Sequence, residues 1–173
     1  MNSDRYTGTA IALHWLIALA IAGTFLLGLY MHELPLSPDK LRFYAWHKWA
    51  GVTIFLLVLV RLGWRLGHQP PSLPTAMPRW QSWAAAWTHH VLYLLMFTVP
   101  VSGWLMSSAK GFTTVWFGFL PLPDLLNKDK ALGEQLAAVH QALNFLLLAL
   151  VAIHAAAAVK HHLINRDDVL RRM

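Results

Sequence analysis

LAAVHQALNFLLLALVAIHAAAAV, residues 136–159, is the stretch that decides the fold. It has no charged residue and is long enough to cross about 30 Å of hydrocarbon as an α-helix. It also holds His140 and His154. At about 100° and 1.5 Å per residue, these histidines lie within roughly 40° of one helix face and about 21 Å apart along the axis. The sequence therefore predicts a transmembrane helix with two imidazoles on one face, too far apart to share a metal ion.

Three further apolar segments extend this prediction to four transmembrane helices. Residues 11–31 carry no charge. The second span, 44–66, reaches full length only by including charged residues near its ends, whose side chains can snorkel. The third, 83–106, follows a proline-rich loop, and residues 107–135 would form the longest connection. Together with residues 136–160, these segments predict an all-α, integral membrane four-helix bundle that forms a single domain over residues 1–173.

Composition supports a membrane protein and excludes several cofactor classes. Hydrophobic residues make up 57% of the chain and charged residues 13%, whereas soluble domains average about 25% charged. The chain has no cysteine, which excludes disulfides, iron–sulfur clusters and covalent haem attachment. The net charge of +6 comes from basic residues beside apolar runs, a pattern that argues against nucleic-acid binding. The first apolar run has full span length and no small-residue cleavage site, so we expect it to stay in the mature chain.

The distribution of basic residues predicts how the helices are oriented. Four spans place eight lysines and arginines on one side of the membrane and six on the other. Cytoplasmic loops usually carry the excess, so both termini are predicted to be cytoplasmic. The predicted cytoplasmic set is Arg5, Arg61, Arg65, Arg79, Lys160, Arg166, Arg171 and Arg172, and the predicted outer set is Lys40, Arg42, Lys48, Lys110, Lys128 and Lys130.

Each histidine of the fourth span has a counterpart at a matching depth. His14 lies a few turns from the cytoplasmic start of the first span, as His154 does from the cytoplasmic end of the fourth. His47 lies near the outer start of the second span, as His140 does near the outer start of the fourth. Paired neutral imidazoles on facing helices are good axial ligands for haem iron. The four histidines therefore predict two stacked haem sites, although a lone histidine in a span more often hydrogen-bonds a neighbouring helix.

Other polar residues near these sites have two interpretations each. Arg61, fourteen residues after the outer histidine of its span, would either bind a haem propionate or snorkel to the interface, and Lys48 has the same two interpretations. Gly51 could let a macrocycle approach the backbone. His89 or His90 could bind a propionate or a quinone, or simply lie at the interface. A solvated role is expected for the remaining histidines, His32, His68, His161 and His162.

These motifs resemble the prokaryotic cytochrome b561 family, which is related to the cytochrome b subunits of membrane hydrogenases and formate dehydrogenases. The resemblance covers almost the whole chain. It rests on HWL at 14–16, HKWAG at 47–51 with Arg61 and Arg65, Pro100 with GWLMS at 103–107, His140, HAAAA at 154–158 and HH at 161–162.

The resemblance implies four transmembrane helices in the bacterial inner membrane, two non-covalent haems b, and electron transfer to or from ubiquinone. It assigns the iron ligands as His14 with His154 and His47 with His140, the same pairs that depth matching gives. It also places His89 near the inner haem. The family includes superoxide oxidases, which take electrons from superoxide at the outer face and reduce ubiquinone. The outer basic residues could draw in such an anion, but an ordinary mixed surface explains them slightly better.

Three functions remain open at this point. The first is a self-contained oxidoreductase that passes electrons from an outer donor, such as superoxide, through two haems to ubiquinone. The second is a cytochrome b anchor and electron carrier for a dehydrogenase or hydrogenase. The third is a metal transporter with a histidine relay, which would need carboxylates within the spans; none lies between the helix ends.

Overall fold

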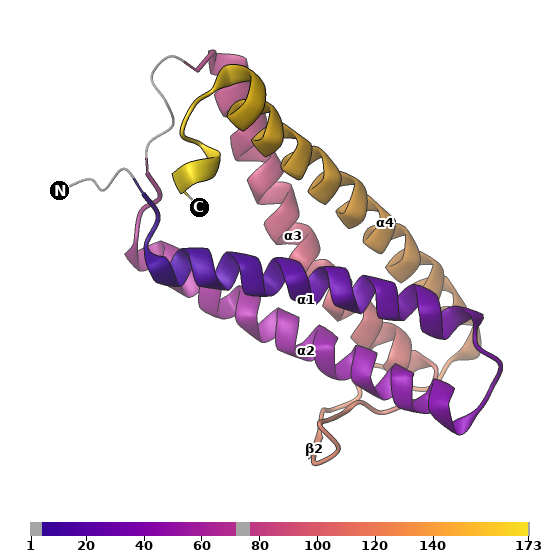
Figure 1. Cartoon of the computed structure of the whole chain (residues 1–173). Helices are drawn as coiled ribbons and strands as arrows, with labels where there is room; N and C mark the ends of the chain where they lie inside the picture. The colour runs from indigo at the N-terminus through magenta and orange to yellow at the C-terminus, as the bar shows by residue number, and fades with distance from the viewer. Residues whose placement is uncertain (1–4, 72–76, 173) are drawn as a thin grey trace.

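The computed structural model describes residues 5–71 and 77–172, and most of these form four long helices (Figure 1). They are α1 (Gly8–Glu33), α2 (Pro38–Gly67), α3 (Arg79–Ala109) and α4 (Lys130–Lys160). Each is long and apolar enough to cross a membrane. The predicted spans 11–31, 44–66, 83–106 and 136–160 fall within α1 to α4 in that order.

Side-chain caps fix where three of these helices begin. The Thr7 hydroxyl accepts a hydrogen bond from the N–H three residues further on (3.3 Å), and Ser37 and Asp129 do the same for α2 (3.2 Å) and α4 (3.0 Å). Such caps satisfy N–H groups that have no partner in the first helical turn. Because α4 begins at Lys130, six residues before the predicted span, and α3 continues to Ala109, the connection between them is 110–129 instead of the expected 107–135.

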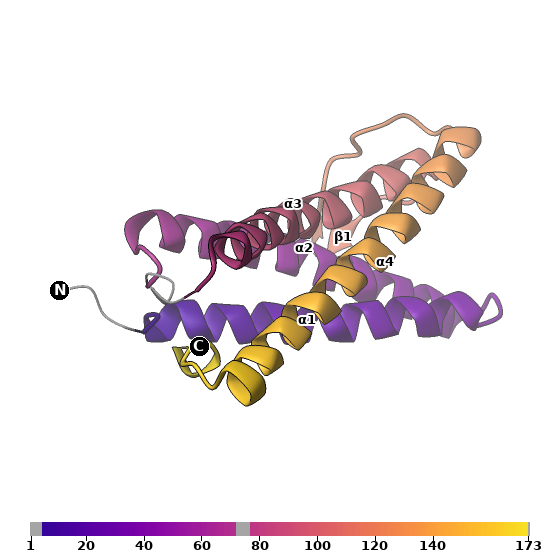
Figure 2. The same cartoon turned by 90° about the horizontal axis from the view of Figure 1, so that it is seen from above.

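The helices pack as two antiparallel pairs, α1 with α2 and α3 with α4, and α2 joins the pairs by packing against α3. The pairs are inclined to one another (Figures 1 and 2). Buried side chains form two small clusters, and large apolar side chains such as Leu19 (69% exposed) and Leu26 (64%) point outward. An apolar exterior is unfavourable in water and suits lipid, where the helices satisfy their own backbone hydrogen bonds. The clusters comprise Ile17, Ile54 and Val58, and Leu92, Leu95 and Leu147.

The two ends of the bundle differ. The terminal end carries both chain termini, where the Tyr6 N–H donates to the Arg172 carbonyl (3.2 Å). At this end the chain leaves α4 through a π-helical turn, η1 (His161–Asn165), and reaches a 3-10 turn, η2 (Leu170–Arg172). The hairpin end, opposite, carries the α1–α2 turn and residues 110–129 (Figure 1).

Residues 110–129, the hairpin cap, fold back against α2. They contain two short antiparallel strands, β1 (Val115–Trp116) and β2 (Leu120–Pro121). The Trp49 indole N–H donates to the Val115 carbonyl (2.6 Å), and the Trp116 indole N–H donates to the Thr53 hydroxyl (3.3 Å). Sequence patterning did not predict this hairpin, because strands of two residues are too short to show alternation.

Candidate functional site

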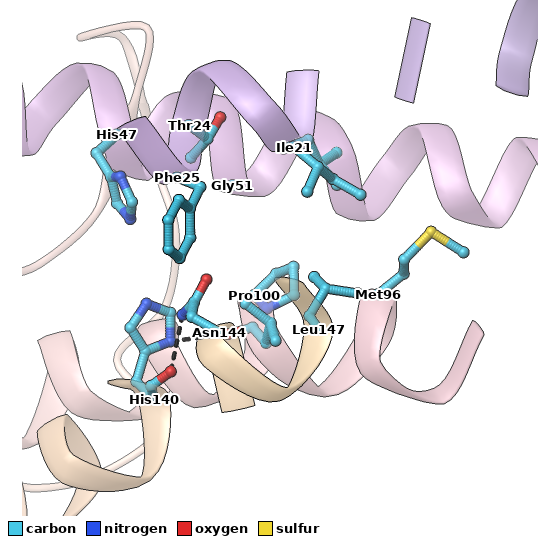
Figure 3. Close-up of a pocket in the computed structure, with 12 residues that line it drawn as sticks. Ile21, Thr24, Phe25, His47, Gly51, Met96, Pro100, His140, Asn144 and Leu147 are labelled. Carbon is cyan, nitrogen blue, oxygen red and sulfur yellow. Dashed lines mark hydrogen bonds between the residues drawn. The ribbon is translucent and has the colours of Figure 1, made fainter. Parts of the chain in front are cut away.

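The first pair of predicted ligands lies toward the hairpin end. His47 of α2 and His140 of α4 face each other across a pocket (Figure 3). Their ring centroids are 6.4 Å apart and their planes are inclined by 84°. The other side chains that line the pocket are mostly apolar and come from all four helices: Ile21, Phe25, Ile54, Met96, Val99, Pro100 and Leu147, with Thr24 and Asn144.

The second pair lies toward the terminal end. His14 of α1 and His154 of α4 have ring centroids 6.3 Å apart and planes inclined by 75°. Each pair therefore joins α4 to one helix of the α1–α2 pair. The structure brings together both pairs that the sequence matched by depth.

The spacing within each pair suits a shared metal ion. Imidazole nitrogens bind metal ions at about 2.0–2.1 Å, and the nitrogen lies about 1 Å from the ring centroid, so two rings on opposite sides of one ion have centroids roughly 6 Å apart. The observed separations of 6.4 Å and 6.3 Å match this value. Two neutral imidazoles in an apolar setting are a donor set that haem b accepts.

The hydrogen bonds of His140 leave one ring nitrogen free for a metal. Its Nδ1 lies 3.1 Å from the Val99 carbonyl oxygen, which can only accept a hydrogen bond. Nδ1 must therefore carry the proton, so Nε2 of the neutral ring has a lone pair available. A metal-ligating histidine commonly donates its other N–H to a carbonyl in this way. His140 thus has the tautomer that an axial ligand needs.

Two further features bear on whether the hairpin-end pair fits a bound group. His47 Nδ1 is buried near the Thr24 carbonyl, yet it forms no hydrogen bond of good geometry with any described residue. A proton on Nδ1, which faces this carbonyl, leaves Nε2 with the lone pair that would bind a metal ion. Gly51 lines the pocket, and a Cβ built there would meet no protein atom within 4 Å. The residues present therefore fit a haem at this pair, including the open backbone that the sequence suggested at Gly51.

Glycines on neighbouring helices make space for both imidazoles of this pair. A Cβ on Gly28 of α1 would lie 3.2 Å from His47 Cε1, and a Cβ on Gly103 of α3 would lie 3.0 Å from His140 Cε1. Both distances are tighter than ordinary carbon contacts, so a methyl group at either position would push the ring. Gly103 belongs to a sequence motif noted above, but its contact with His140 depends on tertiary packing.

We expect Gly103→Ala to remove most of the haem at the hairpin-end pair and to leave the terminal-end pair loaded. The alanine methyl would displace His140, although alanine itself favours a helix by about 1 kcal/mol over glycine. Haem content per chain and the reduced-minus-oxidised spectrum measure the effect. Gly63→Ala is the matched control, because a Cβ at this helical glycine meets nothing within 4 Å. Full haem content in Gly103→Ala would contradict the proposed ligand position.

A third imidazole lies at the terminal-end pair. The His89 ring of α3 is 5.2 Å from that of His154, edge to face. This separation is shorter than the roughly 6 Å expected for two rings that share an ion, and it fits direct ring contact. His90 instead places its Nδ1 2.6 Å from the Ala86 carbonyl on its own helix and is exposed. Of the two adjacent histidines, the structure places His89 at the pair.

Arg61 points into the bundle. It donates through Nε to the Tyr93 hydroxyl (3.0 Å) and through a terminal nitrogen to the Ala10 carbonyl (3.2 Å). Its positive charge acts on three imidazoles at this end, His14, His89 and His154. A guanidinium has five N–H donors, so others remain for an anionic group such as a carboxylate. These bonds favour an interior role over snorkelling. The sequence did not single out Tyr93, since a tyrosine in a span has several ordinary roles.

Lys48 is a structural cation at the hairpin end. Its ammonium donates to the Ser107 hydroxyl (3.3 Å) and to the carbonyls of Phe112 and Thr113 (both 3.2 Å). It therefore fastens the hairpin cap to α2, a role that the sequence interpretation of Lys48 did not include.

Among the remaining histidines, His161 departs from expectation. His32 lies beside Glu33 and His68 stacks on Trp64, both at exposed positions. His161, expected to be solvated, is 16% exposed, and its Nδ1 donates to the Asp167 carboxylate (2.5 Å). Burial raises the pKa of Asp167, but this bond and one from a backbone N–H outweigh burial and hold the pKa below its ordinary value. The interaction secures the turn after α4.

Four long apolar helices with imidazoles facing each other in pairs define a membrane protein of the haem-binding class. A family model described as prokaryotic cytochrome b561 matches residues 5–173. The chain belongs to this family of membrane haem proteins that transfer electrons.

Individual relatives match over almost their whole length. The chain is 34% identical to "Cytochrome b561 homolog 2" of Escherichia coli (strain K12), covering 98% of this chain and 91% of that protein. It is 28% identical to "Cytochrome b561 homolog 1" of the same organism, covering 98% and 97%. It is 27% identical to "Probable superoxide oxidase CybB" of Yersinia pestis, covering 98% and 95%.

Proposed function

We propose that the chain holds two haems b, one in each histidine pair, and transfers electrons between a donor at the hairpin end and ubiquinone in the membrane. The observation that carries this proposal is the presence of two imidazole pairs, with centroids 6.3 Å and 6.4 Å apart, each of which has one member on α4. Helix geometry separates their α4 members by about 21 Å, so each pair can bind its own macrocycle.

The proposed orientation places the hairpin end in the periplasm and the terminal end in the cytoplasm of a bacterial inner-membrane protein. The excess of basic residues at the terminal end supports this assignment. Electrons from a periplasmic donor would then enter at the His47–His140 pair and reach the His14–His154 pair, from which quinone would be reduced.

The residues of each pair have distinct proposed roles. Bound haem iron supplies reversible one-electron chemistry. His47 and His140 would hold one iron, with the free Nε2 lone pair of His140 directed by the Nδ1 bond to Val99. The apolar walls of this pocket limit water, which influences the redox potential. At the terminal end, Arg61 would supply positive charge and N–H donors for a haem propionate.

Superoxide is our proposed donor, and the support comes from the relative named a probable superoxide oxidase. A small anion would be attracted by the positive charges of the hairpin end. Several of these are engaged in the structure: Lys40 donates to the Leu34 carbonyl (2.5 Å), Lys48 holds the hairpin cap, and Lys110 pairs with Glu134 (3.3 Å). Attraction of superoxide would therefore depend on the combined electrostatic potential of all charged groups at the hairpin end.

A haem count on purified protein, with a reduced-minus-oxidised spectrum, tests the proposal. We expect b-type absorption and two haems per chain; protein purified without haem would refute the assignment. Addition of superoxide and a ubiquinone analogue then tests the reaction. Two superoxide ions should each lose one electron to give oxygen, while one quinone takes up both electrons and two protons to give quinol. Haem-loaded protein that consumes no superoxide would refute this donor and leave the cytochrome assignment intact.

Purification under mild conditions tests the alternative of an anchor subunit. A dehydrogenase or hydrogenase that copurifies in fixed proportion, with electrons passing from it to the haems, would replace the self-contained oxidoreductase. Stoichiometric quinone reduction by the isolated chain would support the proposal made above.

A further inference from the structure

Ser102 of α3 forms a buried hydrogen-bonded unit with His140. Its hydroxyl oxygen lies 2.8 Å from the Val99 carbonyl oxygen and 2.9 Å from His140 Nδ1. Ser102 is 6% exposed. Because the carbonyl can only accept, the Ser102 hydroxyl proton is donated to Val99. The hydroxyl oxygen then has lone pairs directed at His140, whose Nδ1 carries the proton. His140 Nδ1–H is therefore shared between two acceptors, the Val99 carbonyl and the Ser102 hydroxyl.

This arrangement distinguishes His140 from its partner across the pocket. His47 Nδ1 lies near one backbone carbonyl, that of Thr24, and forms no hydrogen bond of good geometry with a described residue. Acceptors at the non-ligating N–H fix the ring orientation and raise the basicity of the ligating nitrogen. A more basic axial ligand stabilises ferric over ferrous iron, and this lowers the reduction potential. Within the described residues, His140 is the one of the four predicted ligands whose ring N–H meets two acceptors.

We propose that Ser102 is a positioning residue that lowers the reduction potential of the hairpin-end haem through His140. This inference rests on the proposed function, since it requires His140 to be an iron ligand. A lower potential at the hairpin-end haem favours passage of an electron from this haem to the terminal-end haem. Ser102 thereby contributes to the inward direction of electron transfer.

A purely structural role for Ser102 makes a different prediction. Serine hydroxyls in helices often bond a carbonyl of the preceding turn. Ser108 on the same helix does so, to the Trp104 carbonyl (3.0 Å), and it also accepts from the Leu125 N–H (3.2 Å). It is buried at 2% exposure, and neither bond involves an imidazole. A serine whose hydroxyl bonds only backbone groups would leave the potentials unchanged when replaced. Ser108→Ala is therefore the matched control for Ser102→Ala.

The test is a spectroelectrochemical titration of the haem-loaded protein in detergent or nanodiscs. We expect Ser102→Ala to keep both haems and to shift one midpoint potential to a more positive value, while the other stays in place as an internal reference. Ser102→Thr, which keeps the hydroxyl, should restore the original potential, and Ser108→Ala should shift neither. Unchanged potentials in fully loaded Ser102→Ala would overturn the inference.

A second comparison covers the case in which Ser102→Ala loses haem. Ser102→Thr and Ser102→Val differ by one hydroxyl in side chains of equal shape. Retention of the hairpin-end haem in the threonine variant with its loss in the valine variant would support ligand positioning by the hydroxyl. Equal haem loss in both would overturn the inference. Wild-type protein without haem, in contrast, would refute the proposed function before any variant is measured.

Discussion

Replacing His140 by alanine is expected to remove the hairpin-end haem and to leave the terminal-end haem in place. His140 faces His47 at 6.4 Å, whereas the other α4 histidine, His154, belongs to a separate pair about 21 Å further along the helix. The haem content should therefore fall by half, and one component of the reduced-minus-oxidised spectrum should disappear. His154→Ala should give the complementary loss.

The matched control for this change is His90→Ala. His90 also lies in a membrane-spanning helix, but it is exposed and bonds a carbonyl of its own helix. The control should retain both haems. If His140→Ala lost both haems equally while the control kept them, the two pairs would not be independent haem sites.

The sequence predicted which histidines lie together because helical periodicity and membrane depth are both regular. In an uninterrupted helix, the spacing from His140 to His154 determines their relative direction, and alternating span directions determine which histidines lie at the same depth. His14 and His47 could therefore be matched to them without knowledge of the packing. The structure brings both matched pairs together, with ring centroids 6.3 Å and 6.4 Å apart.

The surroundings of these histidines could not be predicted in the same way, because they depend on which helix faces meet. Ser102 and Gly103 contact His140 only because α3 packs along α4. Tyr93 meets Arg61 for the same kind of reason, across the α2–α3 contact. Helix amphipathicity gives little guidance in a membrane protein, where lipid-facing and core-facing side chains are both apolar. Lys48 shows a further limit of sequence-based prediction. Whether its ammonium is free or hydrogen-bonded depends on how the connection at 110–129 folds.

At the terminal-end pair, we expect two histidines that both lie beside His154 to differ in their effect on haem binding when each is replaced. His14 is 6.3 Å from it, close to the spacing of two rings that share an ion, and His89 is 5.2 Å from it, in edge contact. We expect His14→Ala to lose the terminal-end haem. We expect His89→Ala to keep that haem and to shift its reduction potential, because a neighbouring polar ring is removed without loss of a ligand.

Haem content and a redox titration of the two variants, measured side by side, decide between the ligands. Each variant serves as the control for the other, since both remove an imidazole of equal size from the same region. Retention of both haems in His14→Ala, with loss of one in His89→Ala, would reverse the assignment and make His89 the partner of His154. The iron would then join α3 to α4, two helices that already pack against each other, instead of joining α4 to α1. Loss of the terminal-end haem should therefore loosen α1 from α4 near the chain termini only if His14 is the ligand, and crosslinking between the terminal ends of α1 and α4, with and without that haem, would report the change.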